Sequence, residues 1–163
     1  MTPARLQQNN LRFTLDPLTS DAVRGLIATH LSQMHAQSPI SSVHALDVSD
    51  LQTDDVQFWS VWQNDTLIGC AALKRLSATD GEVKSMHILK AYRGQGYAKA
   101  ILRHVDRCAL AMGLQRLFLE TGSTDDFAPA RGLYKAHGYQ DCPPFGAYKP
   151  DRHSCFMSIK LDA

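Results

Sequence analysis

The chain has 163 residues, of which 44% are hydrophobic and 20% are charged, and its formal net charge is +1. This length predicts a single domain over residues 1–163, and the near-neutral charge argues against general nucleic-acid binding. No apolar run is long enough to predict a transmembrane helix. Residues 1–10 lack the apolar core of a signal peptide, so we expect a cytoplasmic protein without membrane partners.

The cysteines and histidines show no metal-binding pattern. The four cysteines contain no Cys-x-x-Cys pair, so we expect reduced thiols rather than a disulfide framework or a zinc site. His30 and His35 are five residues apart, and His104 stands alone in its segment, so neither offers the i,i+4 spacing of a helical zinc pair. We therefore expect no metal.

The first third of the chain predicts one strand and one helix. Residues 11–15 form a candidate strand, and Thr19, Ser20 and Asp21 are candidate N-caps for the helix that follows. Apolar residues recur there at helical spacing up to Met34, and residues 37–42 break the pattern. Residues 49–55 are polar and indicate a turn.

The remaining segments predict three antiparallel strands and then alternating helices and strands. The expected elements are strands at 56–63, 66–76 and 82–88, a helix at 98–112, a strand at 114–120, a helix at 127–137 and a closing strand at 155–161. Asn64-Asp65 and Asp80-Gly81 supply the hairpin turns. This order predicts a mixed α/β fold.

The segment Arg93-Gly-Gln-Gly-Tyr-Ala98 joins a strand to a helix and is a candidate anion site. Unpaired amides at a helix N-terminus attract phosphate, and glycines let the backbone approach it closely. A P-loop is excluded because Gly-x-x-x-x-Gly-Lys-Ser/Thr is absent, and Lys99 occupies the third glycine position of a dinucleotide fingerprint. Taken alone, the segment fits a glycine-rich turn equally well.

Three ordered motifs resemble the GNAT N-acetyltransferase superfamily. Arg93-x-x-Gly96-x-Ala98 fits its acyl-coenzyme A signature, and residues 117–122 and 133–139 are similar to its fifth strand and its Leu-Tyr-x-x-x-Gly-Phe/Tyr helix. The resemblance covers residues 56–161. It implies an acyl-CoA N-acyltransferase fold, with a mixed, mostly antiparallel central sheet that is splayed between its fourth and fifth strands and flanked by helices.

The resemblance also implies where acetyl-CoA binds. The cofactor-binding residues would be Arg93 with the backbone amides of Gly94, Gln95, Gly96, Tyr97 and Ala98 at the pyrophosphate, and Met86, His87 and Ile88 along the pantetheine arm. The Met86 N–H would polarise the thioester carbonyl. Three positions depart from the family pattern: Phe127 replaces a common asparagine, Lys90 a common proline, and Gln95 a residue that is often basic.

Glu82 and Tyr134 are the candidate catalytic residues. An amine is mostly protonated at neutral pH, so a general base is required, and Glu82 lies where the histone-acetylating branch has its glutamate. His87 is the rival base, and strict strand alternation places it on the opposite face from Glu82. Tyr134 occupies the family's general-acid position. The alternatives are a solvated Glu82 and a Tyr134 that only packs in the core.

The acceptor site is expected between the first helix, its following loop and the C-terminal hairpin. Its candidate residues are Met34, His35, Ser38, His44, Phe145 and Tyr148. The predicted activity is transfer of acetyl from acetyl-CoA to a primary amine of a small molecule or peptide, by direct attack in a ternary complex. Alternatives are another acyl donor or a non-catalytic CoA-binding module. The strand at 155–161 could also pair across a homodimer.

Overall fold

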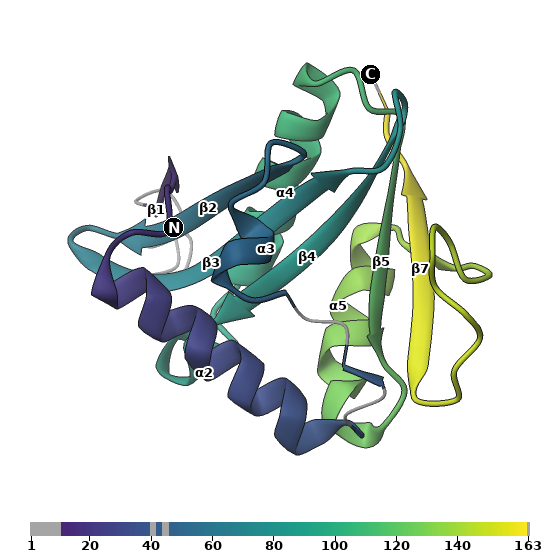
Figure 1. The fold of residues 1–163 in the computed structure, drawn as a ribbon, viewed down its shortest axis with the longest axis horizontal. Coiled ribbons are helices and arrows are strands. Elements are labelled where there is room, and N and C mark those ends of the chain that lie inside the picture. The colour runs from purple at the N-terminus through teal and green to yellow at the C-terminus, as the bar shows by residue number, and fades with distance from the viewer. Residues whose placement is uncertain (1–10, 40–41, 44–45, 163) are drawn as a thin grey trace.

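A seven-stranded sheet forms the centre of the part of the chain that the computed structural model describes, residues 11–39, 42–43 and 46–162 (Figure 1). Its strand order is β1-β2-β3-β4-β5-β7-β6. The strands are β1 (Leu11–Leu15), β2 (Val56–Gln63), β3 (Thr66–Arg75), β4 (Asp80–Ile88), β5 (Arg116–Gly122), β6 (Gln140–Asp141) and β7 (Ser154–Lys160). Only β4 and β5 pair in parallel within this sheet, so the mixed, mostly antiparallel sheet is confirmed.

Helices cover both faces of the sheet. In Figure 1, α2 (Asp21–Gln37) and α3 (Val48–Leu51) lie in front of it, while α4 (Tyr97–Ala111) and α5 (Ala128–His137) lie behind it. Short 3-10 turns, η2 (Lys90–Tyr92) and η3 (Asp125–Phe127), precede α4 and α5. Among the described residues, no helix combines the length and the apolar character that crossing a membrane requires.

The helix α2 begins where the sequence predicts it, because the Ser20 side chain accepts a hydrogen bond from the Val23 amide. The helix α3 departs from the prediction of a turn. Asp47 and Asp50 form a reciprocal capping box there, which stabilises a single helical turn inside a polar segment. The two-residue strand β6 is also absent from the sequence prediction.

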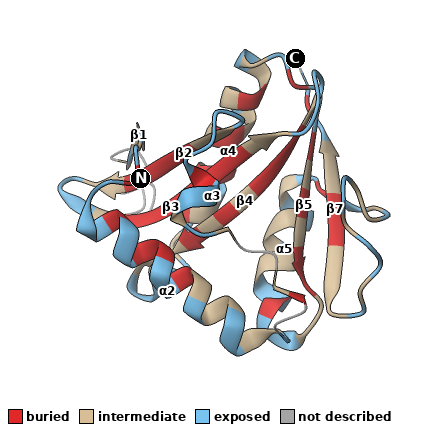
Figure 2. Cartoon of the chain, viewed as in Figure 1, coloured by how far each residue is buried: buried red, intermediate tan, exposed pale blue. Residues whose placement is uncertain are grey.

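Two apolar clusters fill the space between the sheet and its helices (Figure 2). The larger cluster packs α4 against the sheet and includes Leu73, Ile101 and Leu117, each fully buried. The smaller cluster packs α2 against the other face and includes Leu26 and Phe58. Each such side chain contributes about 1.5–3 kcal/mol when fully buried, so the two layers hold the sheet from both sides.

A bulge in β4 changes which side chains share a face. Cys70 of β3 pairs with His87 whereas Ala72 pairs with Lys84, so β4 carries one extra residue, and Ser85 there has a φ of 51°. Cys70 and Ala72 both pack on the α2 side, which places His87 and Lys84 on that side as well. Two residues before Lys84, Glu82 also faces α2.

The prediction that Glu82 and His87 leave opposite faces of the strand is therefore wrong. Strict alternation assumes an unbroken ladder, and the single inserted residue reverses the alternation beyond it.

The ladder between β4 and β5 is short. It joins Asp80 to Arg116, Gly81 to Leu117 and Glu82 to Phe118, and beyond these pairs the two strands diverge (Figure 1). A Cβ on Gly81 would lie 2.8 Å from Leu114 and 3.1 Å from Leu117, so glycine permits the close approach at the joined end. The predicted splay between the fourth and fifth strands is confirmed.

Candidate active site

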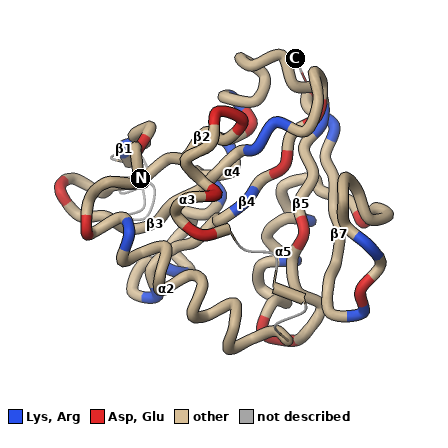
Figure 3. The backbone as a smooth tube through the Cα atoms, in the orientation of Figure 1, with Lys and Arg blue, Asp and Glu red and all other residues tan. Residues whose placement is uncertain are grey.

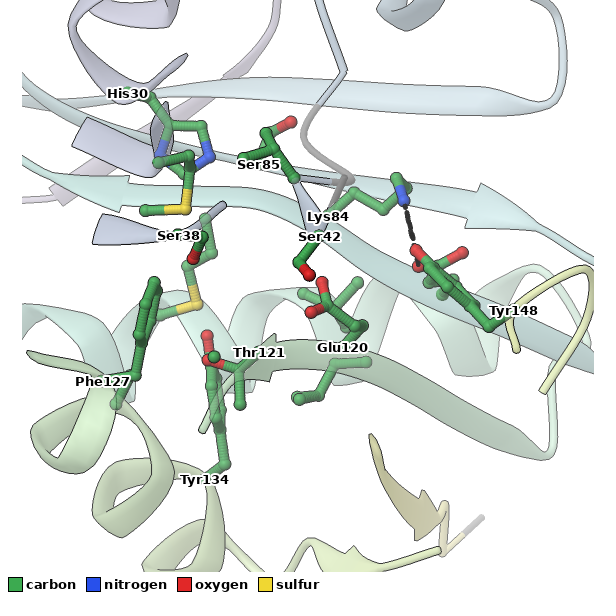
Figure 4. Close-up of a pocket in the computed structure, with 18 residues that line it drawn as sticks. His30, Ser38, Ser42, Lys84, Ser85, Glu120, Thr121, Phe127, Tyr134 and Tyr148 are labelled. Atoms are coloured by element: carbon green, nitrogen blue, oxygen red, sulfur yellow. Dashed lines mark hydrogen bonds and ion pairs between the residues drawn. The ribbon is translucent and has the colours of Figure 1, made fainter. Parts of the chain in front are cut away.

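A cavity of about 150 Å³ opens where β4 and β5 diverge (Figure 4). Its walls come from α2 and the segment after it, from β4 and β5, from α5, and from the loop between β6 and β7. The cavity passes through the plane of the sheet, since Tyr134 of α5 lies behind the sheet and Met34 of α2 in front of it. Two substrates entering from opposite faces could therefore meet here.

Glu82 lies in a hydrogen-bonded group on the wall of this cavity. Its Oε2 accepts a hydrogen bond of 2.6 Å from the Tyr148 hydroxyl and forms a 3.0 Å ion pair with Lys84 Nζ. Lys84 Nζ also donates to the Tyr148 oxygen at 2.9 Å. The Glu82 side chain is only 6% exposed. One of these two donors would have to move before this oxygen could accept a proton from a substrate.

Glu120 is a second carboxylate in the cavity, and our sequence reasoning gave it no role. It projects from β5, and burial raises its pKa to about 7, with the charge of Glu82 also raising the pKa and the charge of Lys84 lowering it. Figure 4 shows Glu120 and Tyr134 directed into the same space. The sequence offered one indication of such a role. Glu120 is an acidic residue that directly follows the apolar run Leu117-Phe-Leu, in a strand that borders the splay.

Tyr134 reaches the cavity from α5. Burial, with a smaller effect from the charge of Glu120, raises the pKa of its phenol to about 12. Its ring packs edge-on against Tyr139 with the centroids 5.8 Å apart, which fixes the ring on the helix. A phenol with this pKa keeps its proton at neutral pH and is available as a donor.

The glycine loop lies beyond the open end of the splay and leads into α4. Gly94 and Gly96 have φ values of 76° and 87°, a region that favours glycine, and Gly96 is the N-cap of α4. A Cβ on Gly94 would meet nothing within 4 Å, so the loop faces open space. The Tyr97 ring is buried in the core, and its hydroxyl accepts a hydrogen bond from Gln63. Its backbone, rather than its side chain, belongs to the loop surface.

The backbone of β4 offers donors to the splay. Leu89 N–H bonds to Ile68 of β3, so alternation along the strand turns the amide of Ile88 away from β3. Met86 lines the cavity. Among the described residues, the Ser85 hydroxyl is buried without a hydrogen-bond partner and lines the same cavity. These groups are available to a ligand lying along β4.

A buried histidine pair joins α2 to β4. Nδ1 of His30 lies 3.1 Å from Nδ1 of His87, and burial lowers both pKa values to about 4. Both rings are therefore neutral at pH 7, with one nitrogen donating and the other accepting. His30 lines the cavity, whereas His87 does not. The contact with His30 occupies Nδ1 of His87. A general-base role of His87 on that side of its ring would need this nitrogen to be free to accept a proton.

The predicted acceptor residues separate into three groups. Met34, Ser38 and Tyr148 line the cavity, while Phe145 lines a second groove beside it. His35 is exposed and lines neither space. His44 lies outside the described residues.

Arg93 joins the glycine loop to α2. Its Nε donates to the Ile88 carbonyl at 2.8 Å, and its Nη2 donates to Gln33 of α2 at 3.2 Å. The side chain is exposed, so its guanidinium can exchange these contacts for an anion at the loop.

Known proteins resemble the chain in both sequence and fold. The family described as "Acetyltransferase (GNAT) family" matches residues 26–139. The uncharacterized N-acetyltransferase YsnE of Bacillus subtilis is 42% identical over 151 residues, covering 93% of this chain and 100% of the relative. The uncharacterized N-acetyltransferase YedL of Escherichia coli is 47% identical over 151 residues, covering 91% of this chain and 95% of the relative.

A solved structure agrees with this assignment. A GNAT family acetyltransferase from Elizabethkingia anophelis, with acetyl-CoA bound, aligns with a TM-score of 0.70 over 94% of this chain and 99% of that chain. At 14% identity the likeness concerns the fold alone. The family match and the near full-length relatives go further, and they confirm the predicted enzyme class. The chain belongs to the acetyltransferase (GNAT) family.

Proposed function

We propose that this enzyme transfers acetyl from acetyl-CoA to a primary amine by direct attack in a ternary complex. One observation carries the proposal: a single cavity in the splay brings together a carboxyl group whose pKa is about 7 and a phenol whose pKa is about 12. A general base is most effective when its pKa lies near the working pH, and a protonated phenol can supply the leaving group's proton.

The cofactor would lie along β4. Its pyrophosphate would bind the amides of residues 94–98 at the N-terminus of α4, where the helix dipole favours an anion. Its pantetheine arm would run along the backbone of β4 at Ile88 and Met86. The Met86 N–H and the unpartnered Ser85 hydroxyl are the nearest candidates to stabilise the oxygen of the tetrahedral intermediate.

Proton transfer in this scheme uses Glu120 and Tyr134. Glu120 takes a proton from the ammonium group, and the neutral amine nitrogen then attacks the thioester carbonyl carbon. Collapse of the intermediate breaks the C–S bond, Tyr134 gives its proton to the departing thiolate, and the resulting phenolate takes up the second proton lost by the amine nitrogen. Glu82 is the alternative base, but Lys84 and Tyr148 already donate to its Oε2. Glu120 is therefore favoured, with Glu82 holding the wall of the cavity.

The size of the cavity favours a short acyl group. About 150 Å³ must hold both the acyl carbon chain and the attacking amine, so we expect acetyl-CoA to be preferred to longer donors. A panel of acetyl-, succinyl- and octanoyl-CoA, with thiol release as the readout, tests this preference.

Three conservative variants test the catalytic roles. We expect Glu120→Gln and Tyr134→Phe each to lower kcat by about 100-fold or more, with the dissociation constant for acetyl-CoA unchanged in titration calorimetry. Glu82→Gln should affect kcat less than Glu120→Gln. A larger loss in Glu82→Gln would assign the base to Glu82 instead. A protein that binds no acetyl-CoA, or that acetylates no member of an amine library, would contradict the proposed function.

A further inference from the structure

A second groove of about 470 Å³ lies next to the cavity, under the loop that joins β6 to β7. The two spaces share three lining residues, Glu82, Lys84 and Tyr148. The groove continues outward from these residues between the ends of β3 and β4 and the loop at 145–151. The cavity and the groove therefore adjoin at these residues, and a molecule that occupies both must pass the group formed by Glu82, Lys84 and Tyr148.

The groove carries two ammonium groups that form no direct ion pair with a described residue. Lys74 and Lys149 line it, and neither has an ion pair or a hydrogen bond from its ammonium group within the described ranges. Lys74 is half-buried, which makes an unpaired charge there costly. Of the two carboxylates of the groove, Glu82 pairs with Lys84 and Asp151 accepts a hydrogen bond from the Ser42 hydroxyl at 2.6 Å, so three lysines face two acids and one positive charge is left over.

This excess of positive charge is local. Acidic and basic residues are interspersed over the rest of the fold (Figure 3), and the net charge of the whole chain is only +1. An anionic group is thus favoured at the groove by nearby lysines rather than by a field of the whole protein.

The floor and loop side of the groove are apolar and partly aromatic. Phe145 and Tyr148 pack edge to face with their centroids 5.0 Å apart, and Phe145 also packs on Phe118 at 4.8 Å. Leu76 adds an aliphatic side chain that is 37% exposed. These contacts hold the rings in place, so they present a fixed surface to an aromatic ring or a short aliphatic chain.

We propose that this groove is the subsite for the far end of the acceptor and that the acceptor is an amino-carboxylate. The carboxylate would bind Lys74 and Lys149, the spacer would lie against Phe145 and Tyr148, and the amine would reach Glu120 in the cavity. The inference rests on the proposed function, because it assigns the amine to that cavity.

The spacer must be longer than that of an α-amino acid acylated at its α-amine. The Tyr148 ring and the Glu82–Lys84 pair stand between the two ends, so amine and carboxylate must be separated by several bonds. 4-(Aminomethyl)benzoate has this shape, and benzylamine is the matched acceptor that lacks only the carboxylate.

Binding without turnover tests the subsite. With coenzyme A saturating, titration calorimetry of the wild-type enzyme should give an affinity about tenfold higher for 4-(aminomethyl)benzoate than for benzylamine, the size expected for a charge-assisted hydrogen bond. The variant Lys74→Met, or Lys74→Met combined with Lys149→Met, should remove this difference. Lys160→Met is the matched control, because Lys160 is exposed at the end of β7 and lines neither space.

The outcomes separate the two proposals. Equal affinity of the wild-type enzyme for the two ligands would overturn the subsite, and so would a preference that survives in the double variant. Acetylation of benzylamine in that case would leave the proposed function standing. A carboxylate preference that Lys74→Met removes, in a protein that acetylates no member of an amine library, would support a carboxylate-binding groove and overturn the proposed function.

Discussion

Two glutamates line one cavity, and their surroundings give them different chemistry. Glu82 is held by an ammonium group and a phenol, while burial dominates at Glu120 and raises its pKa to about 7. A carboxyl group that is half-protonated at neutral pH can both accept a proton and release it. The difference comes from neighbours far apart in sequence, since Tyr148 lies 66 residues from Glu82.

The pH dependence of the rate should report Glu120. Because the base must be deprotonated, we expect kcat/KM to rise with pH through an apparent pKa of about 7. The variant Glu120→Gln should lose this rise of kcat/KM with pH. The variant Glu82→Gln should keep the rise, with lower values of kcat/KM throughout. The measurement is kcat/KM between pH 5.5 and 9. If kcat/KM of Glu120→Gln still rises near pH 7, the titrating group is another residue.

The same pKa predicts a cost in stability. The pKa of Glu120 is raised on folding from 4.5 to about 7, so the unfolded chain releases this proton first and stability falls as the pH rises through that range. By pH 8 the free energy of unfolding is lowered by an amount on the order of 3 kcal/mol. The variant Glu120→Gln has an uncharged side chain at this position and avoids this loss. Urea unfolding should show Glu120→Gln gaining stability over wild type at pH 8 and not at pH 4.5. The same gain at both pH values would refute the assigned pKa.

At the scale of elements, the β4 bulge and the close packing around β5 shape the cavity. Ser85 in the left-handed region costs about 1 kcal/mol, and the bulge places Glu82, Lys84 and His87 on the side of α2. On the opposite wall, the Phe127 ring lies against Gly122 at the end of β5. Phe127 occupies the position where the family often has asparagine, so an aromatic ring replaces an amide on the cofactor side.

Two glycine variants test whether this packing matters. A Cβ on Gly122 would overlap the Phe127 ring, so Gly122→Ala should destabilise the protein by about 1–3 kcal/mol. Gly25 lies inside α2, where an added Cβ would meet nothing within 4 Å, so Gly25→Ala should stabilise by about 0.5–1 kcal/mol. Both changes are measured by urea unfolding. A Gly122→Ala variant as stable as wild type would mean that the ring moves without cost.

Periodicity and caps were sufficient to predict the main elements, and the family resemblance implied the splay. The turn α3 escaped prediction because four residues carry no period, and only the pairing of Asp47 with Asp50 reveals it. The faces of β4 were mispredicted because a bulge leaves no mark in the pattern of residue types. Sequence reasoning did not single out Glu120 because its raised pKa depends on burial by segments distant in sequence, which spacing does not encode.

For the whole molecule, the His30–His87 contact is where the helix layer in front of the sheet meets β4. Both rings are buried and neutral, and the cluster that packs α2 against the sheet beside them is apolar. Protonation of the accepting ring at Nδ1 would remove the acceptor from this contact, and protonation of either ring would place a charge beside the exposed guanidinium of Arg93, which itself lowers both pKa values.

Acid should therefore weaken the contact between these layers. The pKa of each histidine falls from 6.5 to about 4 on folding, so the unfolded chain binds protons first and stability is lost as the pH falls from 6.5 towards 4. The double variant His30→Asn/His87→Asn should show a smaller loss of melting temperature between pH 7 and 4.5 than wild type. If the melting temperatures of the two proteins fall by the same amount over this pH range, the histidine pair is not the cause of the loss.

The three-residue ladder between β4 and β5 divides the sheet into two groups of strands that share few backbone hydrogen bonds. Amides on the open edge of β4, such as Ile88, are thus expected to exchange with deuterated water faster than those bonded to β3, such as Leu89. A bound pantetheine arm would slow the exchange of this edge alone. The cofactor would then act as a missing strand, and the sheet would be continuous only while the enzyme is loaded.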